Sequence, residues 1–173
     1  MKKYSLIVLR LLCIDALNVN ENCSEPLGMQ SGVIQDQQIS ASSSKSTKFS
    51  PQQVLQTISY YFVKKYFLFL KARLNGNDEG GAWCPDQRQN ENNFLEIDLI
   101  NDYVVSGVTL QGRNLNGGEY ASHFRLQFWR MGFTDFADYR HSSGEILLSG
   151  NINAFDTTEQ DLSEMVVIAS KIR

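Results

Sequence analysis

The stretch FLEIDLI at residues 94–100 decides the fold class, because its apolar and polar residues alternate. In an extended strand successive side chains point to opposite faces, so Leu95, Ile97 and Leu99 share one face. That face is wholly apolar, whereas the opposite face carries two carboxylates. The segment is therefore predicted to be a strand with one face in the core.

Similar segments follow it along the chain. The first is expected after a turn at Asn101 and Asp102, where turn-forming residues interrupt the apolar pattern. No helical period separates these segments, and short strands at regular spacing are typical of a β-sandwich or barrel. The segments are VVSGVTLQG (104–112), SHFRLQFWR (122–130, with Phe124, Leu126 and Phe128 on one side), GEILLSGNIN (144–153) and MVVIASKIR (165–173).

Composition limits the function. The 173 residues suit one domain, and 42% hydrophobic residues suffice for a core. A net charge of −3 lacks the basic surface that nucleic-acid binding needs. The sequence has no nucleophile elbow, zinc-protease motif or phosphate-binding loop, and neither His123 nor His141 has metal-ligand spacing. The sequence thus predicts no catalytic residues, no metal and no cofactor.

Residues 1–22 are predicted to be a signal peptide and leader, because Lys2 and Lys3 precede an apolar stretch of suitable length. The alternative is an N-terminal helix. No apolar run is long enough and free enough of charge to span a membrane. We therefore expect a protein that is secreted or exposed at the outer face of the plasma membrane.

Several segments resemble, in order, those of one known family. The segments CSEPLGMQSGVIQDQQISASSS (23–44), ARLNGNDEGGAWCP (72–85), FLEIDL (94–99), TLQGRNLNGGEY (109–120), FRLQFWR, SGEILLSGNIN and VIASKIR are similar to discoidin, or coagulation factor 5/8 type C, domains. The GAWCP and QGR elements look most like the discoidin domain receptors, which are collagen-binding receptor tyrosine kinases. The resemblance covers residues 23–173 and implies a jelly-roll-like β-sandwich of the galactose-binding-domain type, with the final strands missing.

The resemblance also implies a function. Such a domain is a non-enzymatic, extracellular adhesion module that would bind collagen or another matrix protein through loops at one rim. A receptor tyrosine kinase domain would belong to a longer parent protein. The alternative is a lectin-like or phospholipid-binding module, whose partner would be a glycan such as galactose or an anionic lipid.

Six residues are candidates for ligand binding, and all six rest on this resemblance. Arg113 and Glu119 occupy the ligand-facing loop of the collagen-binding receptors, although an ion pair there could be purely structural. Lys45 stands where those receptors carry an exposed tryptophan, and Phe49 is a conceivable substitute for that aromatic anchor. Asp78 and Glu79 form an acidic turn that could receive a basic ligand or a calcium ion, but two carboxylates fall short of the roughly 6–8 oxygens that calcium needs, so a solvated turn is the favoured interpretation. Trp83 is expected in the core.

Two features depart from the family pattern. By count alone, Cys23 and Cys84 could pair with each other or with cysteines outside the given sequence. The resemblance implies that they form disulfides with cysteines near the last strand, but the sequence given holds neither partner. We therefore expect the chain alone to be unstable, since a lost disulfide typically costs about 2–5 kcal/mol; a cooperative melt without free thiols would contradict this.

The segment at 54–71 interrupts the resemblance, and its removal joins SPQQ to ARLN, as in the family. It begins with valine and ends with lysine, whose codons can supply the limits of an intron. We therefore interpret it as a translated intron or gene-model error; a genuine loop insertion is the alternative.

Overall fold

The computed structural model describes residues 6–8, 26–45, 82–86, 93–113 and 118–173. In that part of the chain the strands form a five-stranded sheet of order β2-β3-β10-β6-β7, a three-stranded sheet of order β1-β4-β9, and a β5-β8 pair. All pairings are antiparallel. The elements are β1 (Leu6–Val8), the short 3-10 helix η1 (Asp36–Gln38), β2 (Ile39–Ala41), β3 (Leu95–Val105), β4 (Gly107–Gln111), β5 (His123–Phe124), β6 (Gln127–Trp129), β7 (Ala137–Asp138), β8 (Leu148–Ser149), β9 (Thr157–Asp161) and β10 (Val167–Ile172).

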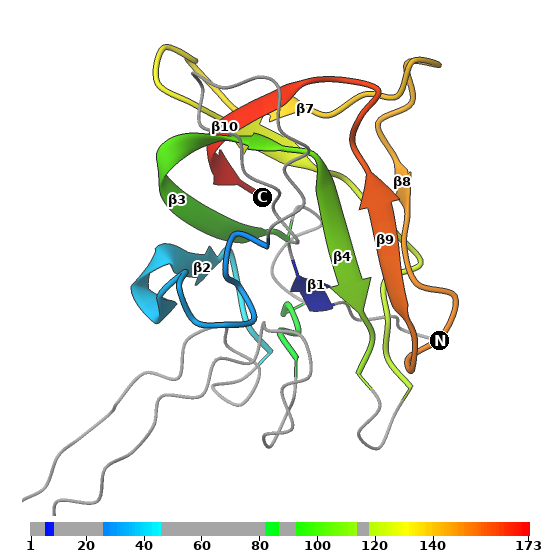
Figure 1. The fold of residues 1–173 in the computed structure, drawn as a ribbon. Coiled ribbons are helices and arrows are strands. Elements are labelled where there is room, and N and C mark those ends of the chain that lie inside the picture. The colour runs from blue at the N-terminus through cyan, green and yellow to red at the C-terminus, as the bar shows by residue number, and fades with distance from the viewer. Residues whose placement is uncertain (1–5, 9–25, 46–81, 87–92, 114–117) are drawn as a thin grey trace, which may run out of the picture.

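The two larger sheets enclose one hydrophobic core. In Figure 1, β4 and β9 lie side by side in one layer, and β3 and β10 curve across the other. The predicted inward face of β3 is buried, and each fully buried large apolar side chain contributes about 1.5–3 kcal/mol. The prediction of an all-β sandwich is confirmed. The core includes Ile39, Trp83, Leu95, Ile97, Leu99, Val108, Leu110, Phe124, Leu126, Phe128, Tyr139, Leu148, Val167 and Ile172.

The predicted turn at Asn101 and Asp102 is wrong. Instead β3 continues through these residues to Val105, and β4 begins at Gly107. The strand bends at Ile100, whose φ of 69° lies in the left-handed region, and the β10-β3 register shifts nearby. The Ile100 N–H donates to Asp98 Oδ1 at 2.8 Å, which stabilises the bend. The chain therefore turns a corner within the sheet without leaving it.

Ile100 is the only non-glycine residue with positive φ in the described ranges, and a β-branched side chain is strained there. It is 69% exposed, so little burial would be lost on its removal. We expect Ile100→Gly to stabilise the chain by about 1 kcal/mol, measured by urea unfolding. Val166→Gly is the control, since Val166 is similarly exposed without positive φ, and it should destabilise. If both variants lost the same free energy of unfolding, the backbone strain at Ile100 would be contradicted.

The strand registers gather several loops at one rim of the sandwich. Gln111 at the end of β4 pairs with Thr157 at the start of β9, and His123 at the start of β5 pairs with Ser149 at the end of β8. The segments that follow β4 and β8 therefore emerge together, at the lower end of β4 and β9 in Figure 1. We call this end the rim.

Strand β1 lies within the segment predicted to be a signal peptide. It pairs with β4 through the register Leu6↔Gln111 to Val8↔Thr109. The cleavage of residues 1–22 stays a prediction. None of the helical turns in the described ranges is long and apolar enough to cross a bilayer.

Candidate functional site

The turn after β4 is closed by Arg113 and Glu119. Their backbones form an isolated antiparallel bridge, in which the Arg113 N–H donates to the Glu119 carbonyl at 2.7 Å and the Glu119 N–H donates to the Arg113 carbonyl at 3.3 Å. The Arg113 Nε also donates to Glu119 Oε2. The two side chains are only 13% and 17% exposed, so solvent screens this pair less than an open surface pair. The two predicted residues are brought together; their contact with a ligand stays a prediction.

The segment around Cys84 is tied to the chain that follows β2. The indole Nε1 of Trp83 donates to the Ser43 carbonyl at 2.8 Å, and the Lys45 N–H donates to the Cys84 carbonyl at the same distance. Trp83 is 4% exposed, which confirms its predicted place in the core. Lys45 itself is exposed. These bonds fix the backbone from which the Lys45 side chain projects.

Charged residues of the Lys45 segment and of the Arg113–Glu119 turn both affect the pKa of the Cys84 thiol. Burial and, to a smaller extent, the Glu119 carboxylate raise the pKa of its thiol to about 11, while Arg113 and Lys45 oppose the shift more weakly. Charges on all three residues therefore act on one buried thiol. Lys45, Arg113 and Glu119 therefore lie within electrostatic range of Cys84.

The loop at 150–156, between β8 and β9, packs against the base of the Arg113 turn. A Cβ added at Gly112 would lie 2.5 Å from the Cα of Ala154, and one added at Gly150 would lie 2.1 Å from the Ala121 carbonyl oxygen. Only glycine permits such close backbone contact. Ile152 and Phe155 of this loop are 85% and 66% exposed. Sequence reasoning missed both, although apolar residues in a Gly- and Asn-rich turn were a signal.

Four of the predicted residues and one predicted segment fall in parts of the chain that the structure does not describe. Phe49, Asp78, Glu79 and Cys23 lie outside the described residues, as does the segment at 54–71. His123 is exposed on β5. In the ranges with described side chains, no three His, Cys, Asp or Glu residues are grouped so that they could hold a metal ion.

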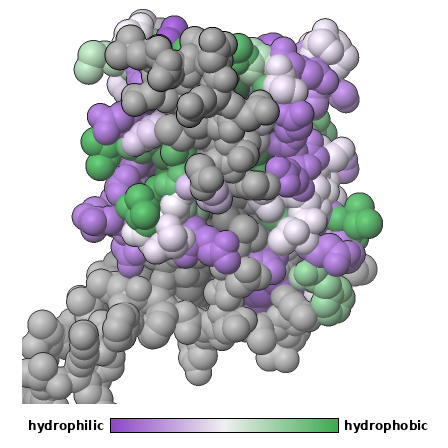
Figure 2. Space-filling view, viewed as in Figure 1, coloured by the Kyte–Doolittle hydropathy of each residue, from purple (hydrophilic) through white to green (hydrophobic). Residues whose placement is uncertain are grey.

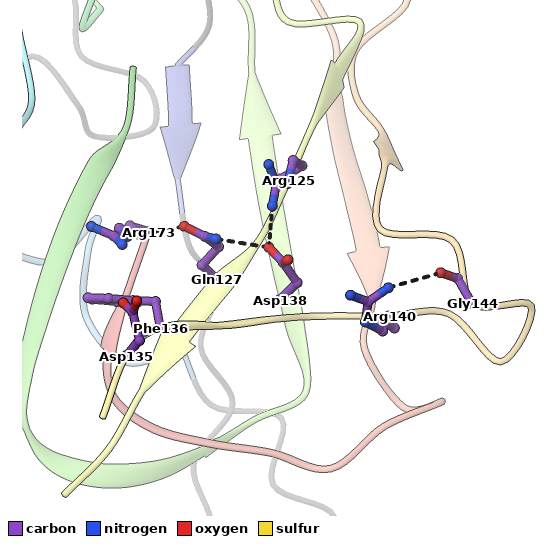
Figure 3. A network of polar contacts seen from close by, with 8 residues as sticks. All are labelled: Arg125, Gln127, Asp135, Phe136, Asp138, Arg140, Gly144 and Arg173. Atoms are coloured by element: carbon purple, nitrogen blue, oxygen red, sulfur yellow. Dashed lines mark hydrogen bonds and ion pairs between the residues drawn. The ribbon is translucent and has the colours of Figure 1, made fainter. Parts of the chain in front are cut away.

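A second polar cluster, on β6, β7 and the C-terminal residue, is structural (Figure 3). Asp138 accepts hydrogen bonds from Arg125 at 2.7 Å and Gln127 at 2.9 Å. Burial raises the pKa of the Asp138 carboxyl, but the hydrogen bonds from Gln127 and Arg125, together with the charges of Arg125 and Arg140, leave the pKa below its usual value. The Arg173 Nε donates to Gln127, and its guanidinium lies 3.7 Å from the centroid of the Phe136 ring. These contacts attach the end of β10 to its neighbours.

Comparison with known proteins agrees with this architecture. Residues 38–173 match the family model described as the F5/8 type C domain. The chain is 32% identical over 165 residues to discoidin domain-containing receptor A of Caenorhabditis elegans, covering 92% of this chain and 19% of that protein. It is 30% identical over 149 residues to the epithelial discoidin domain-containing receptor 1 of Rattus norvegicus (84% and 14%) and 31% identical over 139 residues to human neuropilin-2 (78% and 13%). The chain therefore spans a fifth or less of the length of these relatives.

Proposed function

The chain belongs to the F5/8 type C domain family, and from that membership we propose that it binds an extracellular matrix protein of the collagen type through its rim. The domain is a non-enzymatic ligand-binding module, and two of the relatives named above are discoidin domain receptors. On this proposal it acts in a secreted protein or at the outer face of the plasma membrane, as part of a longer receptor.

The observation that carries the proposal is the Arg113–Glu119 bridge. The side-chain pair and the two backbone hydrogen bonds hold Arg113 and Glu119 against each other, so little free energy is lost in ordering these two residues when a ligand binds. A guanidinium is planar and offers donors in a fixed geometry, which suits the carbonyl oxygens of an extended polypeptide. Glu119 beside it supplies acceptors for N–H groups. A protein backbone offers both partners.

Lys45 adds an exposed ammonium to the same rim. Its backbone is fixed to Cys84, while its long side chain remains exposed. A lysine cannot provide the flat apolar contact of the tryptophan that the resemblance leads one to expect here. On this proposal Lys45 supports the ligand contact electrostatically, and the apolar contact comes from elsewhere.

We expect Arg113→Gln to weaken binding of the full chain to immobilised triple-helical collagen about tenfold, because the glutamine keeps a donor but loses the charge and the planar fork. Arg125→Gln is the control, since it removes another arginine–carboxylate pair, which joins the residue after β5 to Asp138 of β7 at 2.7 Å. Surface plasmon resonance at two salt concentrations measures both. Equal binding by Arg113→Gln and the unaltered chain would remove Arg113 from the site.

The alternative ligands are tested in parallel. Retention on galactose resin without collagen binding would favour a lectin-like module, and sedimentation with phosphatidylserine vesicles would favour a lipid-binding one. Failure of the unaltered chain to bind collagen would overturn the proposed function.

A further inference from the structure

Two exposed apolar side chains lie on one short loop at the rim. Ile152 is 85% exposed and Phe155 is 66% exposed, both on the loop at 150–156. Single exposed apolar residues are common, and hydrophilic and hydrophobic residues are interspersed on the face in Figure 2. Two exposed apolar residues in one short loop, one of them aromatic, are less common at a protein surface. The loop therefore calls for a physical explanation.

Hydrogen bonds hold this loop rigid. The Asn153 Oδ1 accepts from the N–H groups of Phe155 at 2.8 Å and Asp156 at 2.9 Å. The buried Asn151 side chain donates to the Leu110 and Asp156 carbonyls at 3.3 and 2.9 Å. The fold thus fixes the backbone that presents Ile152 and Phe155 to solvent. A rigid apolar contact loses less entropy on binding than a mobile one.

The loop is continuous with the ligand site proposed above. Gly112, which contacts Ala154 directly, immediately precedes Arg113 in the chain. A ligand lying against the Arg113–Glu119 turn would thus pass beside the loop. Interfaces commonly place an apolar anchor next to polar groups that fix orientation.

The charges nearby favour a protein ligand over a membrane. An apolar loop that enters an anionic bilayer is usually flanked by several lysines or arginines. Here Asp156 follows Phe155 directly, and the arginine of the neighbouring turn is paired with Glu119. This mixture suits a polypeptide that carries apolar side chains between polar backbone groups.

We propose that Ile152 and Phe155 are the apolar anchor of the ligand site and contact apolar side chains of the matrix protein bound at Arg113 and Glu119. This inference rests on the proposed function. It supplies the apolar contact that Lys45 cannot make.

The test compares the double variant Ile152→Ser/Phe155→Ser with Met131→Ser in full-length chains on immobilised triple-helical collagen. Met131 is 86% exposed in the turn between β6 and β7, a yellow segment at the upper end of Figure 1. We expect the double variant to bind at least tenfold more weakly and Met131→Ser to bind unchanged. The single variant Phe155→Ala, expected to bind a few-fold more weakly, serves if the double variant fails to fold.

The outcomes separate the two proposals. If Arg113→Gln loses collagen binding but the double variant and Phe155→Ala keep it, the anchor is refuted and the proposed function stands. If the unaltered chain does not bind collagen, both fail. If the double variant loses only binding to phosphatidylserine vesicles, the pair is a membrane contact and the anchor proposal is overturned.

Discussion

Replacement of Asn151 by aspartate is expected to destabilise the domain by about 3 kcal/mol or more, equivalent to a melting temperature about 10 °C lower. Asn151 is 1% exposed, and its Nδ2 donates to the Leu110 and Asp156 carbonyls and to Thr158 Oγ1. A carboxylate cannot donate to any of these oxygens and would place a charge among them. Buried polar groups left without a partner typically cost about 1–3 kcal/mol each.

Three variants of this loop are expected to lose stability in proportion to the buried polar groups that each leaves without a hydrogen-bond partner. Asn151→Ala should cost about 2 kcal/mol, because it removes the donor without adding a charge. Asn153→Ala should cost about 1 kcal/mol, since it removes only bonds that the structure shows at the exposed part of the same loop. Chemical denaturation of all three measures the order. An aspartate variant as stable as the asparagine chain would show that Asn151 does not hold the loop in solution.

The sequence predicted the strands whose burial has a simple period. Leu95, Ile97 and Leu99 are buried as their alternation required. Strand β9 was missed because its sequence, TTEQD, is polar, and both of its faces are exposed or half-buried. Its pairing with β4 makes it a strand, and pairing between distant segments is not encoded in local periodicity. The bend at Ile100 was missed because a bulge depends on the partner strand as much as on its own residues.

Only part of the candidate site could be predicted from the sequence. The resemblance pointed to Arg113 and Glu119, and the structure brings them into contact. The Gly- and Asn-rich turn around Ile152 and Phe155 was a signal of exposure. Both were missed because the apolar type of a residue does not by itself distinguish the core from the solvent-facing surface. Their exposure depends on the hydrogen bonds that the Asn151 side chain donates and the Asn153 side chain accepts, which only the folded chain forms. The alternation of apolar and polar residues therefore could not reveal the buried Asn151, whose hydrogen bonds hold this loop.

The reduced thiol of Cys84 is expected to react with iodoacetamide at least about 100-fold more slowly in the folded chain than in the unfolded chain at pH 8. Only the thiolate reacts, and burial, with the Glu119 carboxylate, raises the pKa from 9.0 to about 11. Two pKa units reduce the thiolate fraction at pH 8 about 100-fold, and steric protection of a side chain that is 1% exposed adds to this. Peptide-resolved mass spectrometry separates Cys84 from the other two cysteines.

The raised pKa of Cys84 also makes the free energy of unfolding depend on pH. Because the folded chain holds the thiol proton more tightly than the unfolded chain, this contribution to the free energy of unfolding is fully present below pH 9 and is lost as pH rises towards 11. The Cys84→Ser chain lacks this thiol, so its free energy of unfolding should fall less than that of the unaltered chain as the pH rises from 9 towards 11. The free-energy difference between the two chains should therefore narrow or change sign over this pH range. Rapid labelling of Cys84 at pH 8 under native conditions would instead mean that the segment from Trp83 to Cys84 opens readily, and that the rim on which Lys45 is mounted is not preorganised for a ligand.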